Sequence, residues 1–244
     1  MKVSLFITCL ADGIYPRVGR AMAKLLVRYG VKPEFPQVQT CCGQPAFNSG
    51  YWDEAKAAAK ILIEAFEDSD FVISPSGSCT SMIHHYYPKL FEDDPHHLAG
   101  AARLIAKTYE FSRFMVDVLG VTDMGASFPH KVTYHPSCHG SRLLGVKDEP
   151  LALLRNVRGL ELLPLPFAED CCGFGGTFAI KMSEISGAMV SEKAEHVLAT
   201  KAEVLVGQDM GCLMNISGRL QCEGKPVRVM HLAELLYEGV RANA

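Results

Sequence analysis

The arrangement of the cysteines constrains this chain most, because the same pattern occurs twice. Two vicinal pairs are each followed by glycine, in Cys41–Gly43 and Cys171–Gly173. With nine cysteines and 21 glycines among 244 residues, even one such tripeptide is rare by chance. A single cysteine precedes each pair and another follows it, at similar distances in both copies. The two sets are Cys9, Cys41, Cys42 and Cys79, and Cys138, Cys171, Cys172 and Cys212.

This repeat predicts an internal duplication, with one half at 1–125 and the other at 126–244. Predicted strands cover 3–8, 31–39 and 71–74, then 131–134, 160–165, 202–206 and 227–230. Predicted helices cover 16–29 and 53–66, then 150–157, 185–198 and 232–237. The order β-α-β-α-β in each half predicts an α/β fold class, with two similar βαβ-rich halves, parallel strands and right-handed crossovers.

Each of the eight repeated cysteines follows a predicted strand. In open parallel sheets, ligands bind outside the carboxyl ends of the strands. We therefore expect the four cysteines of each half to gather at one edge of that half's sheet. Cys222 lies outside both repeats and is interpreted as a spare thiol.

Composition excludes several functions. The net charge is −3 with acidic and basic residues interspersed, which argues against a nucleic-acid surface. No apolar run reaches the ~18 residues of a membrane-spanning helix, so no transmembrane segment is expected. The opening residues indicate a strand rather than a signal peptide, and we expect a cytoplasmic protein. In that reducing compartment, an odd number of cysteines favours metal or redox chemistry over a disulfide framework.

Four thiolates per half can hold a [4Fe–4S] cluster or one zinc ion. Adjacent side chains diverge in extended backbone, so a vicinal pair reaches one ion with difficulty but reaches separate irons of a cluster more easily. One or two iron–sulfur clusters are therefore the favoured interpretation. Zinc in one of the two sites stays open, as do a vicinal disulfide and bare thiols. His135 and His139 flank Cys138, and we interpret them as hydrogen-bond donors near sulfur, as groups that exchange protons with a substrate, or as polar loop residues.

Five stretches carry a resemblance to a known family: Ser4–Leu10, Cys41–Ala46, Ser74–Thr80, Cys171–Phe178 and Gly211–Ile216. They resemble the cysteine-rich CCG domain of heterodisulfide reductase B-type subunits and of the iron–sulfur subunits of glycolate and glycerol-3-phosphate oxidising complexes. The chain is most similar to the lactate utilization protein A family, and the resemblance covers nearly its whole length.

The resemblance implies an iron–sulfur electron-transfer subunit that acts with two other subunits to oxidise L-lactate to pyruvate. It also implies that any contact with L-lactate is made through the complex. One departure matters. Heterodisulfide reductase relatives have a fifth cysteine per repeat, where this chain has Met82 and Asn215. The absence of a fifth cysteine from both repeats argues against a non-cubane cluster and against thiol–disulfide reduction.

A different class of function also fits the cysteines, namely a zinc-binding scaffold or interaction module without a redox role. The sequence shows no flavin or nicotinamide motif, and the glycines near Cys171 lack the spacing of a phosphate-binding loop. The catalytic residues are therefore unassigned from the sequence, and a hydride acceptor is expected in a partner.

Overall fold

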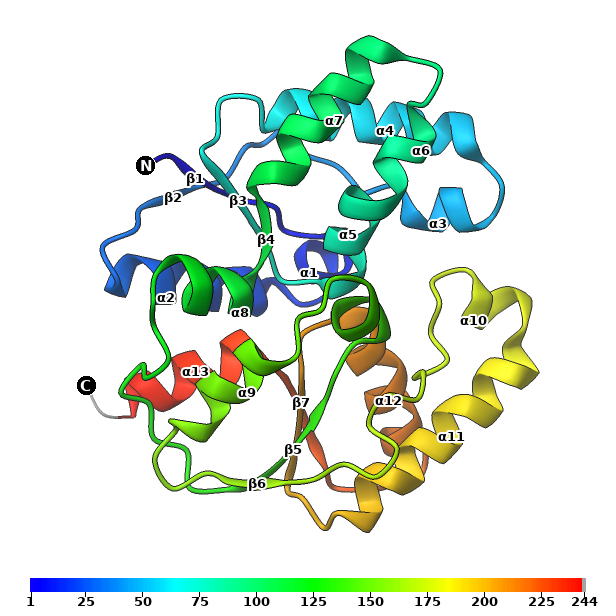
Figure 1. Cartoon of the computed structure of the whole chain (residues 1–244). Coiled ribbons are helices and arrows are strands. Elements are labelled where there is room, and N and C mark those ends of the chain that lie inside the picture. Colours follow the sequence, from blue (N-terminus) through cyan, green and yellow to red (C-terminus); the bar gives the residue numbers. More distant parts are fainter. Residues whose placement is uncertain (243–244) are drawn as a thin grey trace.

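The computed structural model describes residues 1–242 as two α/β halves, which lie one above the other in Figure 1. Within this range, the first sheet has the order β2-β1-β3-β4 and the second has the order β6-β5-β7-β8. The strands of the first are β1 (Val3–Leu5), β2 (Pro33–Glu34), β3 (Phe71–Ser74) and β4 (Thr108–Glu110). Those of the second are β5 (Lys131–His135), β6 (Glu161–Leu163), β7 (Val204–Gly207) and β8 (Arg228–His231).

Every strand pairing in the two sheets is parallel, and the equivalent strands occupy equivalent places. The prediction of an α/β fold with duplicated, parallel halves is therefore confirmed. Sequence analysis missed β4, because a three-residue strand of Thr, Tyr and Glu has no apolar run to mark it. The last two residues of the predicted second half, 126–244, lie outside the described residues.

Helices connect the strands in both halves. Those of the first are α1 (Cys9–Gly13), α2 (Pro16–Arg28), α3 (Gln44–Asn48), α4 (Trp52–Ala65), α5 (Gly77–Ser81), α6 (Tyr87–Leu90), α7 (Pro95–Lys107) and α8 (Phe111–Arg113). Those of the second are α9 (Asp148–Arg155), α10 (Phe178–Lys181), α11 (Ser183–Ala199), α12 (Met210–Cys222) and α13 (Leu232–Arg241). Three π-helical turns complete the set: η1 (Met82–Tyr86), η2 (Phe114–Val118) and η3 (His139–Leu143).

Helix α2 shows how the sequence builds the junction between the halves. Proline at its first position has the backbone angle that a helix start requires, and Gly30 follows its end with φ of +75°. Its buried residues, which include Val18, Met22 and Leu25, recur at helical spacing and make one apolar face. That face packs on α13 of the other half.

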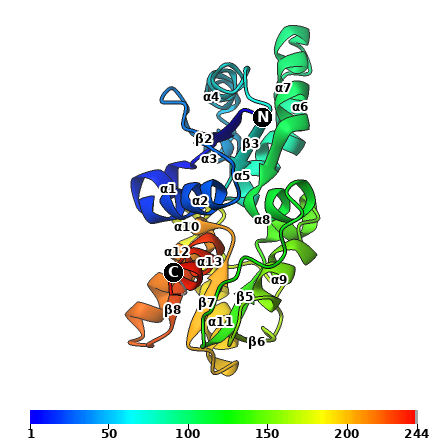
Figure 2. The same cartoon turned by 90° about the vertical axis from the view of Figure 1, so that its left-hand side faces the viewer.

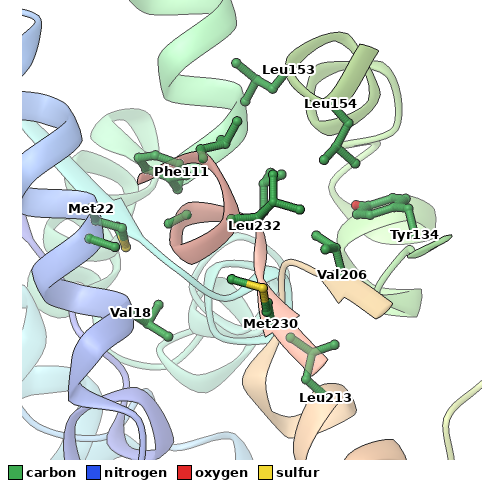
Figure 3. Close-up of a cluster of buried hydrophobic side chains, with 14 of the residues drawn as sticks. Val18, Met22, Phe111, Tyr134, Leu153, Leu154, Val206, Leu213, Met230 and Leu232 are labelled. Atoms are coloured by element: carbon green, nitrogen blue, oxygen red, sulfur yellow. The ribbon is translucent and has the colours of Figure 1, made fainter. Parts of the chain in front are cut away.

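One hydrophobic core therefore continues from the first half into the second. Figure 3 shows Val18 and Met22 of α2 together with Leu232 of α13 and Leu153 of α9. A second, smaller core lies on the other side of the first sheet, beneath α4, α6 and α7. The first sheet is thus covered on both faces, as parallel sheets usually are.

Polar contacts also cross the junction. The Arg17 guanidinium of α2 lies 2.7 Å from the Glu234 carboxylate of α13. His231, which caps the N-terminus of α13, donates from Nε2 to the Pro75 carbonyl at 2.8 Å while its Nδ1 accepts from the Ala233 amide. Figure 2, turned by 90°, shows α1, α2 and α13 stacked along this junction. None of the helices within residues 1–242 combines the length and apolar character needed to span a membrane.

Candidate metal centres

The eight repeated cysteines line one cavity of about 290 Å³ between the two halves. Sequence analysis expected two separate gatherings, one at each sheet. The structure brings both sets to the same cavity, because the carboxyl ends of the two sheets face each other. All nine cysteines are free thiols, and Cys222 lies apart from the cavity at the exposed end of α12.

Helix starts position four of the eight thiols. Cys9 begins α1, and Cys138 directly precedes η3. Cys79 and Cys212 are each the third residue of a helix, α5 and α12 respectively. The starts of α5 and α12 therefore place Cys79 and Cys212 in the lining of the cavity.

The glycine after each vicinal pair turns the chain into the cavity. Gly43 and Gly173 have φ of +84° and +80°, a left-handed conformation that side chains rarely adopt. A Cβ at Gly43 would lie 3.1 Å from the Ala55 carbonyl oxygen. A Cβ at Gly173 would lie 2.8 Å from the Ser186 carbonyl oxygen. Glycine is therefore required both for the turn and for its close packing against α4 and α11.

The carbonyl of the second cysteine in each pair is held by one side chain. The Tyr87 hydroxyl donates to the Cys42 carbonyl at 3.1 Å, and the Asn215 amide donates to the Cys172 carbonyl at 2.8 Å. Asn215 occupies one of the two positions where relatives have a fifth cysteine. Met82 occupies the other and is fully buried in the smaller core. Asn215 thus fixes the backbone of the second pair, and Met82 packs in the same core as Cys42 of the first pair.

Within each set the sulfurs lie close enough to share protons. The Cys9 and Cys41 sulfurs are 3.9 Å apart. Hydrogen bonds from Cys42 and Cys9 lower the pKa of Cys41 to about 3, and hydrogen bonds from Cys138 and Cys172 lower that of Cys171 to about 2. The same contacts raise the pKa of Cys9 and of Cys138. Four thiolates so close together repel one another unless a cation lies among them.

The donor set and the cavity both fit a bound metal group. Thiolates are the ligands that iron–sulfur clusters and structural zinc use. The cavity of about 290 Å³ exceeds the space of a single ion many times over, since one water molecule takes about 30 Å³ of liquid volume. The residues present therefore fit a metal group held by thiolates, either iron–sulfur clusters or zinc.

Asp209 is a site residue that sequence analysis missed. It is buried, lines the cavity and caps α12 by accepting from the Gly211 amide at 3.0 Å. Its other oxygen accepts from the Ser76 hydroxyl and the Ser78 amide, both at 2.9 Å, in the first half. Ser76 and Asp209 each stand three residues before a repeated cysteine, so the equivalent caps of the two repeats meet. This matching position before Cys79 and Cys212 is the sequence signal from which Asp209 could have been identified.

His135 is buried beside the second set, with a ring nitrogen within 4.8 Å of the Cys172 and Cys212 sulfurs. Burial, together with the charge of Lys193, lowers the pKa of His135 to about 4, so its ring is neutral at neutral pH. The Nδ1 atom of His139 lies 3.5 Å from the Cys138 sulfur. The structure therefore places the rings of both histidines next to sulfurs of the second set.

The chain matches a family model described as a cysteine-rich CCG domain at residues 3–84 and again at 132–217. Lactate utilization protein A of Geobacillus kaustophilus is 58% identical over 236 residues, which cover 97% of this chain and 98% of that protein. Lactate utilization protein A 2 of Bacillus cereus is 53% identical over 240 residues, covering 98% and 99% of the two chains.

A hypothetical protein from Helicobacter pylori has a crystal structure that superposes with a TM-score of 0.68 at 10% identity. The match covers 98% of this chain and 49% of that one, so this chain spans about half its length and shares the fold. The family model and the curated relatives confirm the family resemblance carried by the cysteine motifs. The chain is a member of the CCG cysteine-rich domain family and, within it, of the lactate utilization protein A family.

Proposed function

We propose that this chain is the iron–sulfur subunit of an L-lactate oxidation system and works in the cytoplasm with two other subunits. Its relatives at 53% and 58% identity are named for lactate utilization. The observation that carries the chemical part of the proposal is the single cavity lined by all eight repeated cysteines. Two sets of four thiolates would each hold one cluster there.

The named residues would have distinct tasks. Cys9, Cys41, Cys42 and Cys79 would hold the first cluster, and Cys138, Cys171, Cys172 and Cys212 would hold the second. When bound, a cluster supplies one-electron transfer. The helix starts of α5 and α12 and the hydrogen bonds to the Cys42 and Cys172 carbonyls orient the thiolates toward the cavity.

Metal analysis tests the proposal directly. Protein purified without oxygen should contain iron and acid-labile sulfide in equal amounts, should be brown, and should bleach on reduction. Replacing the four cysteines of either set by serine should remove that set's iron, whereas Cys222→Ser should leave the iron content unchanged. A colourless protein without iron would refute the proposal.

One distance favours a second candidate, a zinc-holding scaffold without a redox role. Two thiolates on one tetrahedral zinc ion, each about 2.3 Å from the metal, lie roughly 3.8 Å apart. The separation of the Cys9 and Cys41 sulfurs is 3.9 Å. Zinc in stoichiometric amount, with no sulfide, would establish this function instead, at least for the first set.

We further propose that the second set retains its metal better than the first. Among residues 1–242, histidines lie beside the sulfurs of the second set only, and Phe174, Gly175 and Gly176 of the Gly173–Gly176 loop also line the cavity. Cys171→Ser and Cys212→Ser should therefore cost more bound iron than Cys41→Ser and Cys79→Ser. Equal losses from the two sets would count against this asymmetry.

The role in lactate oxidation requires partners. Conversion of L-lactate to pyruvate releases two electrons and two protons, so a positioned base must accept a proton and the hydride must have an acceptor. The isolated, iron-loaded protein should therefore show no turnover with L-lactate and an artificial electron acceptor, and activity should appear when the two partner subunits are added. Deletion of the gene should abolish growth on L-lactate where no other lactate dehydrogenase compensates, and Cys138→Ser should reproduce the defect in a soluble protein. Robust turnover by this chain alone would make it the catalytic subunit.

A further inference from the structure

His135 is a buried polar side chain that the cysteine sets leave unexplained. It ends β5 and is 1% exposed. Within residues 1–242, neither its Nδ1 nor its Nε2 has a hydrogen-bond partner. An unsatisfied buried donor destabilises a fold, so such a group usually has a partner that the protein chain itself does not provide.

The surroundings of His135 identify that partner. A ring nitrogen lies within 4.8 Å of the sulfurs of Cys172 and Cys212. The second set already offers four thiolates, one for each iron of a [4Fe–4S] cluster, so the imidazole is not needed as a ligand. An imidazole carries at least one N–H group, and thiolate sulfur bound to iron accepts hydrogen bonds.

The first set has no such donor at the equivalent position. His135 stands three residues before Cys138, and Phe6 stands three residues before Cys9. Phe6 is fully buried and packs edge-to-face on Phe66, with ring centroids 5.9 Å apart. At this position the two cysteine sets therefore differ, because the buried side chain is apolar in the first half and a hydrogen-bond donor in the second.

We propose that His135 donates an N–H···S hydrogen bond to Cys172 or Cys212 and thereby holds the reduction potential of the second centre above that of the first. This proposal rests on the iron–sulfur function proposed above. Reduction adds negative charge to the thiolate sulfurs, and a donor aimed at them stabilises the reduced state more than the oxidised state. His135 is thus a positioning residue that makes the two centres unequal.

Redox titration of the full-length, iron-loaded protein, followed by electron paramagnetic resonance, tests the proposal. His135→Phe, which copies the first half, should lower the higher of the two midpoint potentials and leave the other unchanged. His135→Gln keeps an N–H donor and should restore part of the shift. His130→Phe is the matched control, because His130 is exposed just before the same strand and pairs with Glu203 at 2.7 Å.

The outcomes separate this proposal from the function on which it rests. Wild-type protein without iron would refute the iron–sulfur function, before any variant is compared. An iron-loaded His135→Phe protein with wild-type potentials would overturn the role of His135 alone.

A second measurement covers the case in which His135→Phe does not retain iron. Pulsed paramagnetic resonance of wild-type protein containing ¹⁵N-histidine should show a weak nitrogen coupling and an exchangeable proton coupling, as expected for an N–H···S contact. A strong coupling from nitrogen bound directly to iron, or no histidine coupling at all, would overturn the proposal.

Discussion

At the residue scale, the glycine after each vicinal pair decides whether two neighbouring thiols can face one cavity. Gly173 combines a φ of +80° with a backbone oxygen 2.8 Å from where a Cβ would stand. Gly50 has a similar φ of +85°, but a Cβ there would meet nothing within 4 Å. Substitutions at Gly50 and Gly173 therefore distinguish the cost of placing a side chain on left-handed backbone from the added cost of a steric clash.

Gly173→Ala is expected to lower the free energy of unfolding by about 3 kcal/mol or more, because a steric clash adds to the strained backbone, and to reduce the iron that we propose the second set binds. Gly50→Ala, the control, should cost about 1 kcal/mol, because only the left-handed backbone is strained. Urea unfolding and iron analysis of both variants provide the measurement. Equal destabilisation by the two substitutions would show that packing against α11 does not constrain the turn.

Glu110 is a second residue with a measurable consequence. Its carboxylate caps α8 by accepting from the amides of Ser112 and Arg113, yet it is buried. Burial outweighs these hydrogen bonds and raises the pKa of Glu110 from 4.5 to about 7. The folded protein therefore holds a proton on this carboxyl at pH values where the unfolded chain has already released it.

This shift predicts that stability falls as the pH rises from about 4.5 to 7, because the unfolded state binds fewer protons over that range. Glu110→Gln should remove this part of the pH dependence. At pH 8 the variant should be more stable than wild type by on the order of 1–3 kcal/mol, and at pH 4.5 the two should be similar. Chemical unfolding of both proteins across this range measures the difference; parallel curves would contradict the shift.

At the scale of elements, the starts of α5 and α12 form one structural unit. The Asp209 carboxylate accepts hydrogen bonds from its own helix, from the hydroxyl of Ser76, which is the N-cap of α5, and from the amide of Ser78 in its first turn. It therefore caps one helix and joins it to the equivalent helix of the other half. Because each of these helices also carries a repeated cysteine, the cap sets the relative position of Cys79 and Cys212.

Asp209→Ala should lower the free energy of unfolding by about 3–4 kcal/mol, since it removes a cap and leaves buried donors of α5 unpaired. Asp94→Ala is the control. Asp94 caps α7 through the His97 amide and is partly exposed, so its loss should cost about 1 kcal/mol. Thermal and urea unfolding compare the two variants. Similar losses would indicate that the contacts between α5 and α12 contribute little.

At the scale of the whole molecule, the halves share a core. The apolar face of α2, from the first half, packs on α13 of the second, and the larger core includes side chains of both sheets. Each half alone would expose that apolar surface to water. The duplicated halves are thus repeats in sequence, but they are joined by one continuous core.

Separate fragments 1–125 and 126–244 should therefore each lack a cooperative thermal transition, and each should bind a dye for exposed apolar surface. Mixing or co-expressing the two fragments should restore a single transition and the iron content of the intact chain. Circular dichroism and calorimetry measure both results. A fragment that unfolds cooperatively by itself would show that one half folds independently.

The sequence by itself determined the repeat, the parallel α/β halves and the eight cysteines that follow their strands. These features depend on local spacing, such as the apolar runs of β3 and β7 and the glycine after each vicinal pair. Local spacing reports what each segment forms and what lies next to it along the chain.

Only the tertiary structure decided that the two cysteine sets share one cavity, that Asp209 of one half caps α5 of the other, and that His135 lies beside two sulfurs. Each of these contacts joins residues far apart in the chain. They follow from burying the apolar face of α2 against α13, which orients the two sheets with their carboxyl ends toward each other. No periodicity within a single segment encodes that orientation, because the free energy that sets it comes from burying surfaces of both halves together.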